Sequence, residues 1–144
     1  MGIIIRPAVT EDYKDIAELC GTSLGYSCDE ALVKYRLSTL DRSREAVFAA
    51  QSETKVIGFV HAEKYEVLYF DTLANVLGIA VSDEYRRKGA GRMLMQAVED
   101  WAHDIGAAGI RLNSGGSRKD AHEFYRAIGF DNEKTQIRFN KIFE

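Results

Sequence analysis

The chain has 144 residues, of which 28% are charged and 46% hydrophobic, and its formal net charge at pH 7 is −3. This length favours a single domain over residues 1–144, and the weak acidity argues against a broad nucleic-acid-binding surface. No apolar run reaches the roughly 20 residues of a membrane-spanning helix, and the first residues do not resemble a signal peptide, so we expect a cytoplasmic protein that does not bind a membrane. Cys20 and Cys28 lack metal-ligand spacing, and we expect neither a metal site nor a disulfide framework.

Apolar periodicity in the first half of the chain predicts three strands and two helices. In order, the expected elements are a strand at residues 3–5, helices at residues 13–20 and 29–40, and strands at residues 46–51 and 55–68. Thr10 is the predicted N-cap of the first helix, because Glu11 and Asp12 follow it as an acidic first turn. Residues 52–54, Ser-Glu-Thr, separate the last two strands and indicate a hairpin turn.

The second half alternates strands with helices. The expected elements are a strand at residues 73–81, a helix at 93–105, a short strand at 110–113, a helix at 121–128 and a last strand or hairpin within 130–143. Gly78 inside a strand suggests a bulge or a close backbone approach, and a bulge frees N–H and C=O groups. Ser117 and Asp120 have capping-box spacing, and Gly129 marks the end of the last helix. A mixed sheet with helices on both faces accounts for this order.

A basic, glycine-rich segment joins the strand at residues 73–81 to the helix that follows it. Its seven residues are Arg86, Arg87, Lys88, Gly89, Ala90, Gly91 and Arg92. Four of them are cations, although a helix N-terminus carries partial positive charge and ordinarily favours acidic residues. Glycines at such a place let backbone N–H groups approach a ligand closely. Free amides, a helix dipole and basic side chains together predict a bound polyphosphate.

Two motifs in this half carry a family resemblance. Residues 86–91 fit the pattern (Arg/Gln)-x-x-Gly-x-(Gly/Ala), directly after a strand, and residues 121–130 fit Ala-x-x-Phe-Tyr-x-x-x-Gly-Phe. With the order of the elements, they resemble the GNAT superfamily of acetyl-CoA-dependent N-acetyltransferases. The resemblance covers residues 73–143 well and the first 70 residues in element order only. It implies an α/β (α+β) fold, with a mixed, mostly antiparallel sheet of about six to seven strands and helices on both faces.

The resemblance also implies where acetyl-CoA would bind. Backbone groups of Ile79, Ala80 and Val81 would pair with the pantetheine arm as an added strand. Amides of the basic segment, residues 86–92, would hold the pyrophosphate. The remaining coenzyme contacts would come from Asn113, Arg118, Ala121, Phe124 and Tyr125. For Arg118, capping or solvating the start of its helix is an equally good interpretation.

Catalytic roles follow from the same resemblance. Tyr125 would act as general acid and protonate the departing thiolate, which a phenol with a pKa near 10 can do; without the basic segment, a core aromatic would be the simpler interpretation. Many family members place a Glu on the strand before the pyrophosphate loop, but this chain has Leu77 and Gly78 there. The general base must therefore come from elsewhere. The candidates are Glu63, Glu66, Asp71, His61 and a water chain to a distant carboxylate.

The sequence thus predicts an enzyme that transfers an acetyl group from acetyl-CoA to a primary amine of a small molecule, by direct attack in a ternary complex. A narrower similarity points to aminoalkylphosphonate acetyltransferases, while a polyamine, an aminoglycoside, an amino acid, a protein N-terminus or a lysine remains open as acceptor. The alternatives are a non-catalytic acyl-CoA-binding or sensing module, favoured by the missing Glu, and a general nucleotide binder. A homodimer is possible through exchange or pairing of the last strand.

Overall fold

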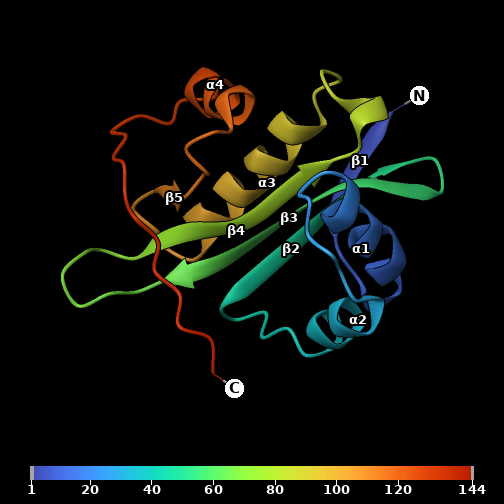
Figure 1. The fold of residues 1–144 in the computed structure, drawn as a ribbon, viewed down its shortest axis with the longest axis horizontal. Coiled ribbons are helices and arrows are strands. Elements are labelled where there is room, and N and C mark those ends of the chain that lie inside the picture. The colour runs from blue at the N-terminus through green and yellow to red at the C-terminus, as the bar shows by residue number, and fades with distance from the viewer. Residues whose placement is uncertain (1, 144) are drawn as a thin grey trace. The chain divides into compact units, whose positions relative to one another are not determined.

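The computed structural model describes residues 2–143, which divide into two compact units, one ending at Leu112 and the other beginning at Asn113. The first unit holds a sheet and three helices (Figure 1). Its strands are β1 (Ile3–Pro7), β2 (Glu45–Ser52), β3 (Lys55–Tyr65), β4 (Leu73–Val81) and β5 (Ile110–Leu112), and its helices are α1 (Tyr13–Thr22), α2 (Glu30–Ser38) and α3 (Ala90–Asp104). The hairpin predicted at residues 52–54 is confirmed, because β2 ends at Ser52 and β3 begins at Lys55, with only Glu53 and Thr54 between them.

The sheet is mixed and mostly antiparallel, as expected. Its strand order is β1-β2-β3-β4-β5, and only the β4–β5 pair is parallel. The fold class is therefore confirmed, but the described residues form five strands rather than six or seven. The difference lies in residues 130–143, where the structure has no strand.

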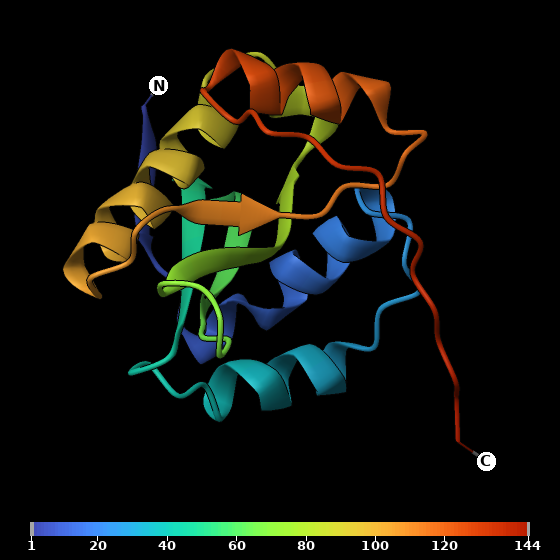
Figure 2. The same cartoon turned by 90° about the vertical axis from the view of Figure 1, so that its left-hand side faces the viewer.

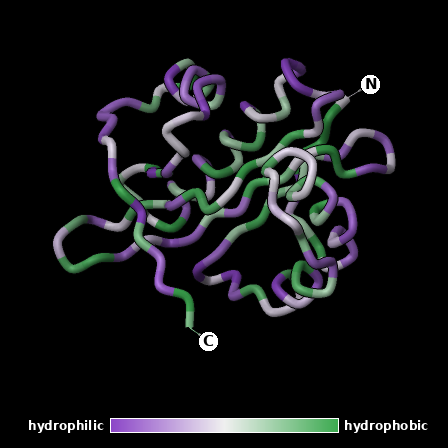
Figure 3. Tube along the Cα trace, viewed as in Figure 1, coloured by the Kyte–Doolittle hydropathy of each residue, from purple (hydrophilic) through white to green (hydrophobic). Residues whose placement is uncertain are grey.

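Helices cover both faces of this sheet (Figure 2). On one face, α1 and α2 pack into a core cluster that includes Ile16, Leu19, Leu37, Val47, Ala49, Phe59 and Ala80. On the other face, α3 packs through Leu94, Val98 and Ala102, all of them buried. Gly58 allows this close approach, since a Cβ there would lie 3.3 Å from a Leu94 methyl and 3.1 Å from the Ala80 carbonyl oxygen. Hydrophobic residues accordingly follow the strands (Figure 3).

A β-bulge interrupts β4 where the sequence predicts one. His61 on β3 pairs with Gly78, while the next residue, Ala62, pairs with Val76, so Leu77 is the extra residue. A bulge of this kind moves the following backbone groups out of register with the preceding ones. The expectation placed on Gly78 is therefore confirmed, and the bulge falls midway along β4.

The first helical segment begins differently from the prediction. Thr10 lies inside a short 3-10 turn (Thr10–Asp12), and the N-cap residue of α1 is Asp12. The Asp12 carboxylate accepts a hydrogen bond from the Val9 amide and two from the Arg6 guanidinium, at 2.8–2.9 Å. Burial alone would raise the pKa of Asp12, but these hydrogen bonds and the Arg6 charge bring it below its ordinary value. Neither the predicted Thr10 nor the Asp12 side chain caps α1; the buried Asp12 carboxylate instead binds Arg6 and the amide that precedes the 3-10 turn.

The second unit contains α4 (Lys119–Ala127) and the chain that follows it. Gly129 ends this helix as predicted: it has a φ of 104°, and the Phe130 amide donates to the Tyr125 carbonyl. Ser117 is not the cap, because the N-cap position falls on Arg118 and no side chain caps the helix there. The strand predicted within residues 130–143 is also wrong. Its alternation is real, but within the described residues this segment forms no ladder with another strand, and a strand requires one.

Candidate functional site

Among the described residues, no strand pairs with the outer edge of β4 beyond its bulge, and this edge is called open. Pairing with β5 covers only residues 74–76 of β4. The Ser82 amide donates to the Ile57 carbonyl, and in an antiparallel ladder hydrogen-bonded pairs alternate with non-bonded ones. Ala80 therefore turns its backbone groups toward β3, whereas Ile79 and Val81 turn theirs away from β3. Two of the three residues expected at the pantetheine arm thus present N–H and C=O groups at this edge.

The loop after α1 reaches the same edge. Ser23 lies just beyond α1, and its hydroxyl donates a hydrogen bond of 3.2 Å to the Val81 carbonyl. This bond takes up one of the outward-facing acceptors of β4. The Val81 amide and both groups of Ile79 remain as the donors and acceptor available to a ligand that lies along the edge.

The basic segment forms a tight turn that leads into α3. Gly89 is the N-cap residue, with φ 87° and ψ 1°, a left-handed conformation that suits glycine. The first intrahelical bond runs from the Met93 amide to the Gly89 carbonyl, so the amides of Ala90, Gly91 and Arg92 have no helical acceptor. The helix thus begins three residues before the predicted start at residue 93. The glycines and basic residues of this segment show no apolar periodicity, so the sequence did not predict a helix there, yet residues 90–92 form the first turn of α3.

The cations of this turn differ in how they are held. Arg86 pairs with Asp83 at 3.0 Å, and the Lys88 ammonium lies 5.5 Å from the centre of the Tyr85 ring. Arg87 and Arg92 are exposed, and within residues 2–143 neither forms an ion pair. Exposed cations beside three free amides at a helix N-terminus make an anion-binding arrangement.

A polar cluster lies on the face of the sheet that α1 and α2 cover in part. Glu63, Asn75 and Arg111 are register partners on β3, β4 and β5. The side-chain nitrogen Nδ2 of Asn75 donates to the Glu63 carboxylate at 2.8 Å, and Arg111 donates to the side-chain oxygen Oδ1 of Asn75 at 2.7 Å. The Arg111 guanidinium carbon lies 4.3 Å from the centre of the Tyr65 ring. Sequence reasoning missed Arg111, because only the parallel pairing with β5 brings it here.

The other candidate bases lie in different surroundings. His61 contacts Glu45 of β2, with 2.9 Å between Nε2 and a carboxylate oxygen. Glu66 lies just beyond β3, is exposed and pairs with Arg44 at 3.0 Å. Asp71 is exposed in the loop between β3 and β4. Glu45 was not a sequence candidate; it could have been found only by assuming the β2–β3 register.

Tyr125 lies in the second unit. It is buried, and its ring is 5.4 Å from that of Phe124 and 5.9 Å from that of Phe130 between centres. Burial raises the pKa of the Tyr125 hydroxyl, and the charge of Arg118 lowers it by less, so the phenol stays protonated at neutral pH. Asn113 follows β5 and is exposed, as is Arg118, whereas Ala121 and Phe124 are partly buried on α4.

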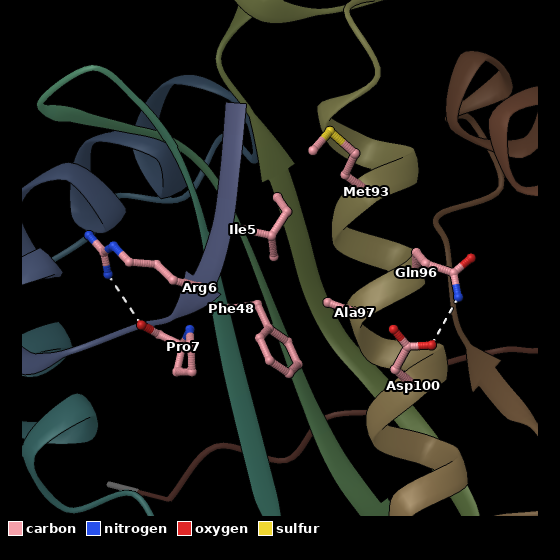
Figure 4. Close-up of a pocket in the computed structure, with 8 residues that line it drawn as sticks. All are labelled: Ile5, Arg6, Pro7, Phe48, Met93, Gln96, Ala97 and Asp100. Carbon is pink, nitrogen blue, oxygen red and sulfur yellow. Dashed lines mark hydrogen bonds between the residues drawn. The ribbon is translucent and has the colours of Figure 1, made fainter. Parts of the chain in front are cut away.

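A groove of about 390 Å³ lies elsewhere in the first unit, between α3 and the β1–β2 side of the sheet (Figure 4). It is lined by Ile5, Arg6, Pro7, Phe48, Met93, Gln96, Ala97 and Asp100. None of the predicted coenzyme or catalytic residues lines it. The part of the chain that the structure describes also contains no helix able to cross a membrane and no cluster of three metal-ligating side chains.

The outer edge of β4 and the turn at Gly89 are typical of proteins that bind a phosphate-bearing ligand along a strand, and comparison with known proteins gives the family. A family model described as "Acetyltransferase (GNAT) family" matches residues 9–130. The chain therefore belongs to the GNAT acetyltransferase family and is an acetyltransferase.

Relatives resemble it to different extents. An uncharacterized N-acetyltransferase of Bacillus subtilis, YhdJ, is 44% identical, but over 54 residues that cover 37% of this chain and 38% of that protein. An aminoglycoside N(6')-acetyltransferase type 1 of Stenotrophomonas maltophilia is 24% identical over 97% of this chain and 94% of that protein. Among solved structures, AAC(6')-Iy in complex with the bisubstrate analogue CoA-S-monomethyl-acetylneamine superposes with a TM-score of 0.84, at 19% identity over 99% of this chain and all of that one. This structural likeness establishes the fold.

Proposed function

We propose that the protein transfers an acetyl group from acetyl-CoA to a primary amine of a small molecule, by direct attack within a ternary complex. The observation that carries the proposal is the turn at Gly89, which leaves the amides of residues 90–92 unbonded among exposed cations. A pyrophosphate is the natural occupant of such a turn. The outward groups of Ile79 and Val81 lie on the strand that leads into it, where a pantetheine arm can pair by strand addition.

Direct transfer is favoured by the state of the thiols. Cys20 and Cys28 are both free, and burial, with a smaller effect from Cys28, raises the pKa of Cys20 to about 11. Because the thiolate is the nucleophilic form, Cys20 is a poor carrier of a covalent acetyl group. In the direct route the amine nitrogen attacks the thioester carbon, the C–S bond breaks, and the thiolate takes a proton.

Tyr125 is the proposed source of that proton. Its phenol is held in the protonated form by burial, as an acid at neutral pH must be. Glu63 and Glu66 are the sequence-derived candidates for the base that takes the proton from the acceptor. Both carboxylates are already engaged, Glu63 with Asn75 and Glu66 with Arg44.

A cationic acceptor is the substrate class we propose. Glu45 on β2 and Glu63 on β3 are register partners on one face of the sheet, and carboxylates there favour an ammonium group. Two relatives that align with 97% and 78% of this chain are named as aminoglycoside N(6')-acetyltransferases, which supports polyamine-like sugars as the first acceptors to try. An aminoalkylphosphonate is the competing class of acceptor. Arg111, which is linked to Glu63 by hydrogen bonds through Asn75, could bind its phosphonate group.

The test measures release of the coenzyme thiol with a panel of amines: sisomicin, neamine, spermidine, 2-aminoethylphosphonate and amino acids. Calorimetry with CoA and acetyl-CoA is run in parallel. We expect CoA to bind, and a cationic amine to accelerate thiol release most. Tight CoA binding with no acceleration by any amine would contradict the proposed function, and a preference for the phosphonate would contradict the acceptor class.

We also propose that the protein forms a homodimer through residues 130–143. Four large apolar side chains are almost fully exposed there, Ile137, Phe139, Ile142 and Phe143. Monomers rarely leave such a group in water, and strand pairing with a second copy would bury it. Light scattering on the intact chain measures the mass directly.

A further inference from the structure

The proposed function gives no role to His61, which pairs with Glu45. The Nε2 atom of His61 lies 2.9 Å from a Glu45 carboxylate oxygen, and each side chain is 31% exposed. A carboxylate only accepts hydrogen bonds, so in the neutral imidazole Nε2 carries the proton. The lone pair then lies on Nδ1, which makes Nδ1 the basic atom. Glu45 thus fixes the tautomer and would stabilise the imidazolium once His61 gains a proton.

The pair lies where the helical cover of the sheet ends. Along β2, Ala49 and Val47 are at most 5% exposed beneath α1 and α2, and Glu45 follows on the same face. Along β3, Phe59 is 6% exposed, and His61 follows on the same face. His61 is therefore the first polar side chain of this face on β3, at the border between core and solvent.

The bulge of β4 leaves open space beside His61. Gly78 is the register partner of His61, and a Cβ built at Gly78 would meet no atom within 4 Å. Ile79 and Val81, whose backbone N–H and C=O groups face away from β3, lie one and three residues beyond Gly78. A thioester lying along that edge would therefore meet unfilled space next to an imidazole.

Glu63 is less suited to the same task. It is the register partner of Asn75, which lies on the far side of the bulge from Ile79. Its carboxylate accepts from Asn75, and Asn75 in turn accepts from Arg111. This chain of hydrogen bonds holds Glu63 to the β4–β5 side of the sheet.

We propose that His61 is the general base of the acetyl transfer and that Glu45 is its positioning residue. The inference rests on the proposed function. Nδ1 of His61 takes a proton from the acceptor ammonium, and the freed nitrogen lone pair attacks the thioester carbon. The C–N bond forms as the C–S bond breaks, and the thiolate receives a proton from the acid. The acylated nitrogen gives its second proton to the conjugate base of that acid, which restores the acid, and His61 returns its proton to water.

The experiment compares kcat of His61→Gln with that of the intact protein, using the best amine of the panel. Glutamine keeps an N–H donor for Glu45 but has no basic nitrogen. General bases contribute about 10²–10⁴-fold, so kcat should fall by about 100-fold or more, while acetyl-CoA affinity and circular dichroism stay unchanged. His103→Gln, at an exposed histidine in the last turn of α3, is the matched control and should keep full activity.

Three further measurements separate a base from a structural residue. Added imidazole should restore turnover to His61→Ala, and hydroxylamine, which is largely neutral at pH 7 and needs no base, should react with all variants at similar rates. Glu45→Gln should lower kcat more than KM and Glu45→Asp should recover most of the loss, with Glu53→Gln as control. A His61→Gln variant of normal kcat overturns this inference alone. A wild-type protein that binds acetyl-CoA but acetylates no amine overturns the proposed function and the inference with it.

Discussion

Replacing Gly89 by alanine tests the coenzyme turn most directly. The φ of 87° at Gly89 is left-handed, and a Cβ there would meet no atom within 4 Å, so the cost is backbone strain alone. An alanine in this conformation costs roughly 1–2 kcal/mol. Because residues 86–89 are exposed, the free turn can relieve the strain by changing conformation, which turns the amides of residues 90–92 away from one another.

Binding of CoA must then restore the original turn and meet that cost. Since 1.4 kcal/mol corresponds to a factor of ten, the Kd for CoA should rise by roughly 5- to 30-fold. Calorimetry with CoA and with pantetheine measures the effect. Pantetheine has no pyrophosphate, so its Kd should change little.

Gly106→Ala is the matched control. Gly106 lies just beyond the other end of α3, has a φ of 74° and also has open space at its Cβ position. The same substitution should reduce stability by a similar amount and leave CoA affinity unchanged. If Gly89→Ala weakens pantetheine as much as CoA, or leaves both unchanged, the amides of residues 90–92 do not hold the pyrophosphate.

Three other variants test separate parts of the molecule. Tyr125→Phe should lower kcat at least 100-fold and leave acetyl-CoA affinity unchanged, because it removes only the acid; a loss of affinity alone would make Tyr125 a packing residue. Asp12→Asn should lower the free energy of unfolding by about 2 kcal/mol at pH 7, because it breaks charged hydrogen bonds from Arg6. The pKa of Asp12 in the folded state is lowered, so the ionised carboxylate stabilises the fold above the unfolded-state pKa of about 3.9, and this stabilisation is lost as the pH falls through the folded-state pKa. Urea titrations of variant and parent should therefore show a smaller difference in the free energy of unfolding at about pH 3 than at pH 7. An equal difference at the two pH values would contradict this account. Phe139→Asp should shift the mass measured by light scattering from dimer to monomer, and a Phe139→Asp dimer would exclude residues 130–143 from the interface.

Local signals predicted most of the fold. The hairpin at Glu53, the bulge beside Gly78 and the end of α4 at Gly129 each depend on a few neighbouring residues, and all are in the structure. The start of α3 was predicted three residues too late, because glycine has little helix propensity and the basic segment shows no apolar periodicity. The left-handed Gly89 begins the helix all the same, and the first turn needs no strong helix former.

The contacts between side chains at the site could not be predicted, because they depend on pairing between strands far apart in the sequence. Whether Glu45 meets His61, or Arg111 meets Asn75, depends on the register of β2 against β3 and of β5 against β4. No residue near Glu45 encodes that register by itself. The strand predicted from the alternation within residues 130–143 is absent for a related reason, since a strand exists only where it pairs with another strand.

The hydrogen bond from Ser23 to Val81 has a consequence for the kinetics. It fastens the connection between α1 and α2 to the strand along which the coenzyme is proposed to lie. A coenzyme bound along β4 would then restrict the motion of the connection between α1 and α2. By reciprocity, an acceptor held by this connection would raise the affinity for the coenzyme. We expect the KM for each substrate to fall as the other approaches saturation.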